Sequence, residues 1–169
     1  FSSDEIRKQC PWATLGRKGG RQPNIITSLE LDSAVMEQNN LRFQKKYAEI
    51  EANEVRYEEY QTEDADYILV AFGSSARICN KTVQLAREQG IKVGILRPIT
   101  LWPFPTKEIA KLADRTKGFL VAELNAGQMI EDVRLAVNGK VSVEHYGRMG
   151  GMLFSPDEIL QALKEKVIK

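Results

Sequence analysis

Short, unbroken apolar runs recur through the second half of the chain, and a different pattern follows each of them. The runs are "YILVAF" at 67–72, "KVGILRP" at 92–98, "GFLVAE" at 118–123 and "VSVEHY" at 141–146. Runs of this length are typical of strands that are buried on both faces. Because a helical pattern follows each run, the sequence predicts a parallel sheet with right-handed crossovers and a three-layer α/β/α sandwich.

The helical segments are marked by their ends. The segment 76–90 closes at Gly90, a second helix is predicted from about 106 to 113 with Thr106 as its cap, and a third around 128–137. Near the C-terminus, "SPDE" at 155–158 places serine, proline and glutamate in the spacing of a capping box, with the proline at the first helical position. The sequence thus predicts a final helix from this point.

The region before the first apolar run divides into three parts. "VRYEEY" at 55–60 alternates apolar and polar residues, as an edge strand does, and opens an α/β domain at 55–169. Residues 32–54 predict a helical arm with an apolar stripe. Residues 1–31 are expected to be irregular, a linker from a missing N-terminal domain, since the chain lacks an initiator methionine. The apolar stripe of the arm consists of Val35, Leu41, Phe43, Tyr47 and Ile50.

Charge and cysteine content narrow the function classes. The formal net charge is +1, which gives no field to attract nucleic acid or an anionic membrane, and no apolar run reaches the ~18–20 residues that span a bilayer. Cys10, Cys79 and the single His145 are too few for a zinc site or an iron–sulfur cluster. Lone cysteines without a signal peptide favour the cytoplasm.

Four loops follow the strands, where open α/β sheets bind ligands. "GSSA" at 73–76 is able to cradle a phosphate, but ordinary serine capping of the next helix is favoured because no phosphate-loop motif is present. Arg17, Lys18 and Arg21 in "GRKGGRQP" at 16–23 could bind phosphate or an acidic partner surface, although a solvated linker is favoured.

The other three loops carry the candidate interface residues. "RPITLWPFP" at 97–105 either exposes its aromatics to a partner or folds back over the sheet. "ELNAGQM" at 123–129 favours hydrogen bonding over catalysis, and His145 is expected to be a satisfied structural histidine. "GRMGGM" at 147–152 is either a structural turn or a binding loop. The candidates are Trp102, Phe104, Glu123, Asn125, Gly147, Arg148, Met149, Gly150 and Gly151, and no catalytic, cofactor-binding or metal-ligating residue is predicted.

Three long segments carry a family resemblance. "RPITLWPFP", "AELNAGQMIEDVRLAVNG" and "YGRMGGM" resemble the α subunit of 2-oxoacid:ferredoxin oxidoreductases, most of all the type that acts on 2-ketoisovalerate (3-methyl-2-oxobutanoate). The resemblance continues upstream to about Pro11. It implies a transketolase C-terminal-like domain with a five-stranded mixed sheet, in which four strands are parallel and one edge strand, "VRYEEY", is antiparallel.

The resemblance also implies a multi-subunit assembly. Such assemblies decarboxylate a 2-oxoacid on thiamine diphosphate and Mg²⁺, pass electrons through iron–sulfur clusters to ferredoxin, and transfer the acyl group to coenzyme A. The chain's implied partners are its own N-terminal domain, a β subunit and a ferredoxin-like subunit. The family's cofactor residues have no matching positions here, so the isolated chain is expected to be inactive and to bind no thiamine diphosphate. The alternative is a flavodoxin-like nucleotide or small-molecule-binding module. One form of this alternative is a regulatory domain that binds a small molecule in the cleft at the strand ends.

Overall fold

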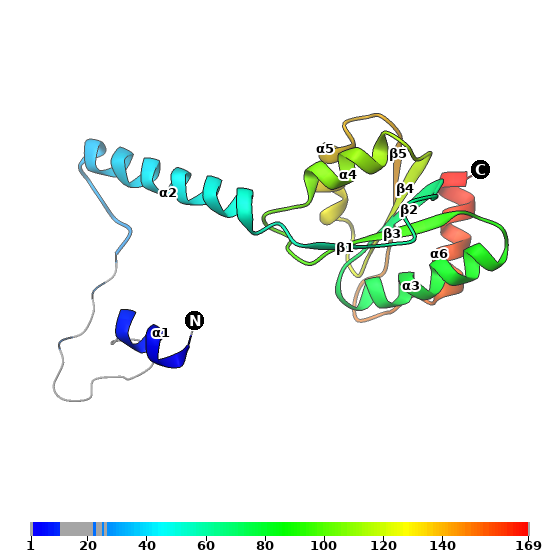
Figure 1. Ribbon diagram of the computed structural model, residues 1–169, viewed down its shortest axis with the longest axis horizontal. Helices are drawn as coiled ribbons and strands as arrows, with labels where there is room; N and C mark the ends of the chain where they lie inside the picture. Colours follow the sequence, from blue (N-terminus) through cyan, green and yellow to red (C-terminus); the bar gives the residue numbers. More distant parts are fainter. Residues whose placement is uncertain (1, 11–21, 23–24, 26, 169) are drawn as a thin grey trace. The chain divides into compact units, whose positions relative to one another are not determined.

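The computed structural model describes residues 2–10, 22, 25 and 27–168 (Figure 1). The chain divides into two compact units, Phe1–Phe43 and Gln44–Lys169. The boundary falls inside the long helix α2 (Ser33–Asn53), so the helical arm contributes residues to both units.

A five-stranded sheet forms the centre of the second unit. Its strands are β1 (Tyr57–Tyr60), β2 (Tyr67–Val70), β3 (Val93–Pro98), β4 (Gly118–Glu123) and β5 (Ser142–Gly147). They lie in the order β1-β3-β2-β4-β5; β1 pairs antiparallel with β3, and the other neighbours are parallel. The mixed sheet with four parallel strands and one antiparallel edge strand is therefore confirmed.

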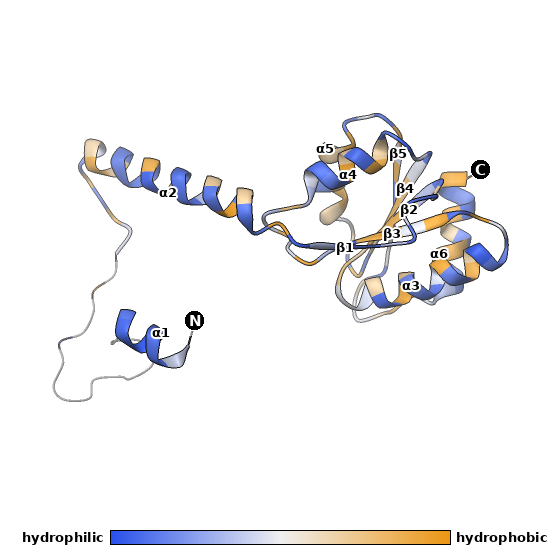
Figure 2. Cartoon of the chain, in the orientation of Figure 1, coloured by the Kyte–Doolittle hydropathy of each residue, from blue (hydrophilic) through white to orange (hydrophobic). Residues whose placement is uncertain are grey.

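Helices cover both faces of this sheet (Figure 1). They are α3 (Gly73–Glu88) and α6 (Pro156–Leu163) on one face, and α4 (Thr106–Ala113) and α5 (Met129–Val137) on the other. Successive strand residues point to opposite faces, so Leu69 packs with the α3 and α6 residues whereas Ile68 packs with those of α4 and α5. Figure 2 shows the apolar residues on the sheet and on the helix sides that face it.

Burial along the strands follows their place in the sheet. Every residue of β4, at its interior, is buried, and every residue of β1, at its margin, is exposed. The unbroken apolar run and the alternating "VRYEEY" thus have the environments that the sequence predicts.

Two predicted caps are wrong. Helix α3 begins at Gly73, its N-cap is Phe72, and no N-cap side chain accepts a hydrogen bond, so the serines lie within the first turn. Gly73 adopts a φ of +56°, which turns the chain into the helix one step before the serines. Similarly, Pro105 is the N-cap of α4, and Thr106 is its first helical residue without a capping bond.

The C-terminal capping box is confirmed. The Ser155 hydroxyl accepts a hydrogen bond from the Glu158 backbone N–H (3.2 Å), and the Glu158 carboxylate accepts one from the Ser155 N–H (2.6 Å). Helix α6 then continues into the short π-helix η2 (Lys164–Ile168).

Residues 1–31 are not wholly irregular, as the sequence analysis expected. Helix α1 (Ser3–Gln9) forms there because Ser2 and Glu5 make a second capping box. Arg17, Lys18 and Arg21 lie outside the described residues.

The helix predicted at 32–54 is confirmed as α2. The Asp32 carboxylate accepts hydrogen bonds from the N–H groups of Ala34 and Val35, and no residue of α2 is buried.

Candidate functional site

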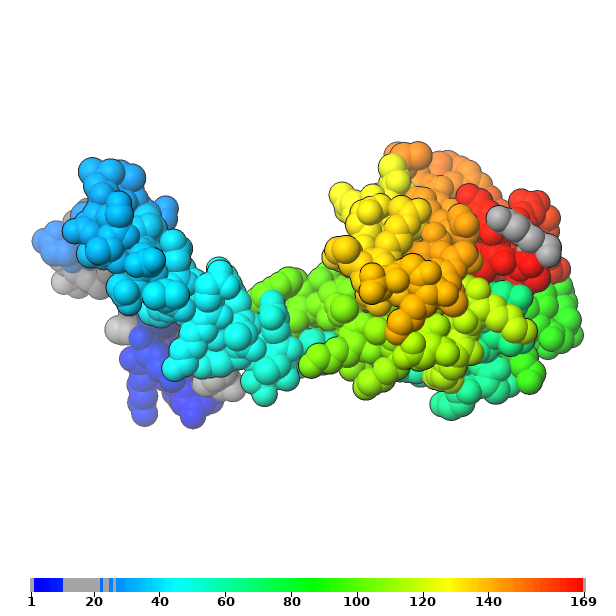
Figure 3. All heavy atoms as spheres, turned by 90° about the horizontal axis from the view of Figure 1, so that it is seen from above, coloured from blue at the N-terminus to red at the C-terminus, as the bar shows by residue number. Residues whose placement is uncertain are grey.

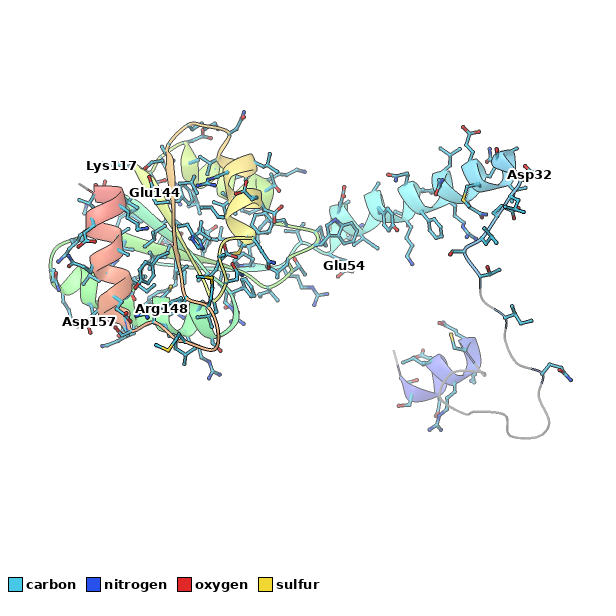
Figure 4. All side chains as sticks on the ribbon, turned by 180° about the vertical axis from the view of Figure 1, so that it is seen from behind. Asp32, Glu54, Lys117, Glu144, Arg148 and Asp157 are labelled. Atoms are coloured by element: carbon cyan, nitrogen blue, oxygen red, sulfur yellow. The ribbon has the colours of Figure 1, made fainter. Side chains whose placement is uncertain are left out.

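The four parallel strands end at one edge of the sheet, and the candidate loops leave from that edge. In Figure 4, Arg148, just after β5, lies at the end of the sheet opposite to Lys117, just before β4. The strand-end loops therefore form one face of the second unit, and each contributes to it differently.

Glu123, the last residue of β4, is 1% exposed, and its carboxylate is surrounded by donors. The backbone N–H groups of Met129 (2.9 Å), Ile130 (3.1 Å) and Gln128 (3.2 Å) donate to it. The Gln128 side chain makes no cap, so the buried carboxylate takes over that role at the start of α5. The positive end of the helix and the charge-assisted bonds stabilise this buried charge. Glu123 thus has a hydrogen-bonding role within the fold.

Asn125 arranges the same loop. Its side-chain oxygen accepts a bond from the Gly127 N–H (2.7 Å), and its amide nitrogen donates to Glu123 (3.2 Å). Gly127 has a φ of +110°, a conformation that residues other than glycine rarely adopt. Two candidate interface residues, Glu123 and Asn125, are therefore occupied by contacts inside the loop.

His145 on β5 lies beside Glu123 but is not satisfied, so that part of the sequence analysis is wrong. Its Nε2 is 3.7 Å from the Glu123 carboxylate, too far for a hydrogen bond, and is buried with no hydrogen-bond partner in the described part of the chain. Burial lowers the pKa of His145, against the opposing attraction of Glu123. The register of β4 and β5 pairs Val121 with His145. The approach of His145 to Glu123 is therefore a contact between two neighbouring strands.

Position 147 has no room for a side chain, so glycine is required there. A Cβ atom built there would lie against the backbone oxygen of Asn125 and 2.5 Å from Cε1 of His145. Real Cβ atoms do not come so close, so Gly147 is fixed by the packing of the β4 and β5 ends.

Arg148 holds the loop after β5 to helix α6. Its guanidinium forms an ion pair with the Glu158 carboxylate, and its backbone N–H donates to the Glu123 carbonyl (3.2 Å). The bonds from Ser155 and then from Arg148 lower the pKa of Glu158. The next residues turn outward: Gly150 and Gly151 have positive φ angles, and Met149, Met152 and Leu153 are each more than half exposed.

The loop after β3 combines both predicted arrangements. Phe104 is partly buried against the core beside α4 and α5, whereas Trp102 is 54% exposed. The Trp102 ring lies edge-on to Tyr47, at 5.6 Å between centroids. A groove of about 660 Å³ runs between this loop and the end of α2 and is lined by Ala48, Ala52, Val55, Trp102, Pro103 and Phe104, among others.

Several exposed apolar residues were not among the candidates. Ile99 and Leu101 flank the aromatics and are about half exposed, and Leu124 in the loop after β4 is 37% exposed. Leu135 on α5 is 77% exposed. Figure 3 shows the face of the second unit to which the α5 region, in yellow to gold, contributes. An isolated aliphatic residue carries no signal of its exposure, so only the position of the first three in strand-end loops could have indicated them.

The donor set among the described residues does not fit a metal ion or an iron–sulfur cluster. No group of three or more His, Cys, Asp or Glu side chains comes together there. Cys10 and Cys79 are free, and burial raises the pKa of Cys79 to about 12, which disfavours the thiolate that binds metals. Nor does any helix in the described ranges have the length and apolarity to cross a membrane.

Comparison with known proteins yields one family and a consistent set of relatives. Residues 65–159, more than half of the chain, match the pyruvate:ferredoxin oxidoreductase core domain II. The ketoisovalerate oxidoreductase subunit VorB of Methanothermobacter thermautotrophicus is 45% identical over 161 residues, which are 95% of this chain and 45% of that protein. The chain thus spans less than half the length of this curated relative.

Solved structures share the fold. A 2-oxoglutarate:ferredoxin oxidoreductase from Magnetococcus marinus aligns with 89% of this chain and 27% of its own, at a TM-score of 0.68 and 21% identity. A split-gene transketolase aligns with 67% of this chain and 41% of its own, at 0.58 and 15%. The sheet order, the strand-end loops and the matched residues agree: the chain belongs to the family of the pyruvate:ferredoxin oxidoreductase core domain II.

Proposed function

We propose that this chain is a non-catalytic structural and subunit-interface domain of a thiamine-diphosphate-dependent 2-oxoacid:ferredoxin oxidoreductase. One observation carries the proposal. The ionic groups of the loops after β4 and β5 are used inside the fold, where Glu123 caps α5 and Arg148 pairs with Glu158, while the apolar side chains of Trp102 and Met149 face outward. A catalytic face keeps its ionic groups available for a substrate, whereas an interface presents aromatic residues and methionine.

The outward side chains are those that interfaces favour energetically. Trp102 is held in place by Tyr47, so its binding costs little side-chain entropy. Met149 and Met152 are flexible and adapt to a partner surface. Arg148, although charged, is anchored to α6 by Glu158. It thereby fixes the start of the loop that carries Met149 and Met152.

In the proposed enzyme, a 2-oxoacid is oxidatively decarboxylated to acyl-CoA and ferredoxin is reduced. The name of the VorB relative supports 3-methyl-2-oxobutanoate as the substrate. Thiamine diphosphate, Mg²⁺ and iron–sulfur clusters would be held by the other parts of the complex, namely the subunit's own N-terminal domain, the β subunit and the ferredoxin-like subunit. Coenzyme A and ferredoxin are the proposed co-substrates, and the cytoplasm is the proposed location.

Co-expression of all subunits of the complete oxidoreductase with a Trp102→Ala chain tests the proposal. Loss of a central interface tryptophan costs about 2 kcal/mol or more of binding free energy. We therefore expect a lower fraction of assembled complex by light scattering after size exclusion. Ferredoxin reduction with 3-methyl-2-oxobutanoate should fall in parallel, with unchanged activity per assembled complex.

The matched control is Leu135→Ser, which also removes an exposed apolar side chain but lies outside the strand-end loops. It should leave assembly unchanged. A Trp102→Ala complex that assembles normally but turns over slowly would contradict the interface role and indicate a catalytic one. Thiamine diphosphate that binds tightly to the 169-residue chain alone, measured by calorimetry, would also contradict it.

A further inference from the structure

Helix α2 is a part of the chain that the proposed interface role does not use. It has 21 residues, the length of three heptads, and none of them is buried. Helices of globular proteins owe most of their stability to the packing of an apolar face, so a long helix without such packing indicates that another surface covers it. In Figure 2, apolar residues recur along α2.

The spacing of residues along α2 specifies the geometry of that cover. Met36, Phe43 and Ile50 are seven residues apart, and Asn40 and Tyr47 fall between them at steps of four and three. This is the heptad spacing of a coiled coil, with Met36, Phe43 and Ile50 at d positions and with Asn40 and Tyr47 at a positions. The five residues therefore form one seam on a single continuous helix.

The seam is accessible to a second helix. Phe43 and Tyr47 are each 42% exposed, although the Tyr47 ring also contacts Trp102. Asn40 is exposed as well. An asparagine at an a position is costly to bury alone, but the same residue of a parallel partner helix satisfies its hydrogen bonds. Asn40 thereby favours two parallel helices in register.

Charged residues beside the seam indicate that the second helix is another copy of α2. In a parallel pair, each g residue faces the e residue five positions further along the other helix. Lys46 is at g and Glu51 is at e, so two copies form two Lys46–Glu51 pairs. Neither residue forms an ion pair with a described side chain of its own chain.

The same charges disfavour the opposite orientation. An antiparallel pair that aligns Tyr47 with Phe43 of the second helix brings each Lys46 close to its own equivalent. It also brings Glu37 close to Glu51 of the second helix. Like charges placed together across an interface oppose association, so the charges select the same parallel arrangement as Asn40 does.

We propose that α2 pairs with α2 of a second copy of this chain as a parallel, two-stranded coiled coil. The association goes beyond the interface role of the strand-end loops, because it joins two equal chains through residues outside those loops. Three heptads are close to the minimum for a coiled coil, so the dimer should dissociate on dilution.

Sedimentation equilibrium of the 169-residue chain over a range of concentrations tests the proposal. We expect a monomer–dimer equilibrium. Lys46→Glu and Glu51→Lys each replace two attractive pairs by two repulsive ones, and each should weaken dimerisation by about tenfold. The double variant, and an equimolar mixture of the two single variants, bring opposite charges together again and should dimerise like the wild type.

Lys45→Glu is the matched control. It makes the same change of charge at the f position, which points away from the seam, and should leave the dimer unchanged. A wild-type chain that stays monomeric at its highest soluble concentration would overturn the proposal. So would a Lys45→Glu dimer as weak as that of Lys46→Glu, or single variants that the double variant does not rescue.

A cross-link determines the orientation of the two helices. In a Cys10→Ser background the remaining native thiol, Cys79, is buried. Asn40→Cys then places two thiols at facing a positions of a parallel pair, within the reach of a disulfide, and oxidation should yield a covalent dimer on a non-reducing gel. Gln38→Cys, at an outer f position, should remain monomeric. An Asn40→Cys chain that cross-links no faster than Gln38→Cys would refute the parallel seam.

Discussion

The loops after β4 and β3 leave the same edge of one sheet, yet they are stabilised in opposite ways. The β4 loop is organised by polar contacts around Glu123, which is buried and accepts bonds from the backbone of α5. The β3 loop is organised by Phe104 against the core and leaves Trp102 half exposed beside Tyr47. The first loop completes the fold, and the second offers a surface, so position at a strand end does not by itself indicate a site.

Replacement of Glu123 by alanine gives the largest expected effect and tests the closed loop. It leaves the first N–H groups of α5 without their acceptor inside the protein and removes a fully buried side chain. We expect a loss of about 3 kcal/mol or more in the free energy of unfolding, measured by urea titration. Glu123→Gln, which preserves the shape and one acceptor, should lose less. Equal stability of all three proteins would show that the carboxylate does not hold this loop.

Gly147→Ala tests the same region through packing. The added methyl group meets His145 and the backbone of Asn125, so we expect a destabilisation of about 2 kcal/mol from overpacking. Gly150→Ala is the control: its positive φ is strained by a side chain, but nothing lies within 4 Å of it. A thermal unfolding midpoint that falls no further in Gly147→Ala than in Gly150→Ala would argue against the close approach of the β4 and β5 ends.

The pH dependence of stability isolates His145. Its pKa is lower in the folded protein than the value near 6.5 of the unfolded chain, so the unfolded state binds more protons in this range. The stability associated with neutral His145 is complete above that value and is lost as pH falls below it. Denaturant titrations at several pH values, compared between the wild type and His145→Gln, should converge toward low pH. Since the sequence has one histidine, a parallel pair of curves would reject this origin.

Trp102→Ala should have the smallest effect on the isolated chain and thereby sharpens the comparison. The side chain is half exposed, and among the described residues its ring contact is with Tyr47, so we expect a loss of about 1 kcal/mol. Urea unfolding of the 169-residue chain measures it. A destabilisation as large as that of Glu123→Ala would place Trp102 among the residues that hold the fold.

The strands, their order of burial and the C-terminal capping box could be predicted because each depends on residues close together in sequence. The run "GFLVAE" coincides with β4, and "SPDE" with the start of α6. The seryl cap of α3 was mispredicted because a positive φ at Gly73 starts the helix early, a choice that the sequence does not display. Helix α1 was missed although Ser2 and Glu5 carry a capping signal.

The contacts within the candidate site were harder to predict from the sequence. Glu123 caps a helix that begins six residues later, beyond the spacing of local capping motifs. The approach of His145 to Glu123 depends on the pairing of two strands, and the groove beside Trp102 depends on α2. Such contacts exist only once the chain is folded, so the residue types of the loops alone do not predict them.

The composition of β1 has a consequence for the behaviour of this domain outside its complex. β1 is four residues long, pairs with β3 alone among the described strands, and carries Glu58 and Glu59; each of its residues is exposed. A longer, apolar strand in this place would be a template for a strand from another copy and hence for aggregation. Adjacent carboxylates repel their equivalents in a second molecule, so this margin of the sheet resists fibril growth even when the domain is produced alone.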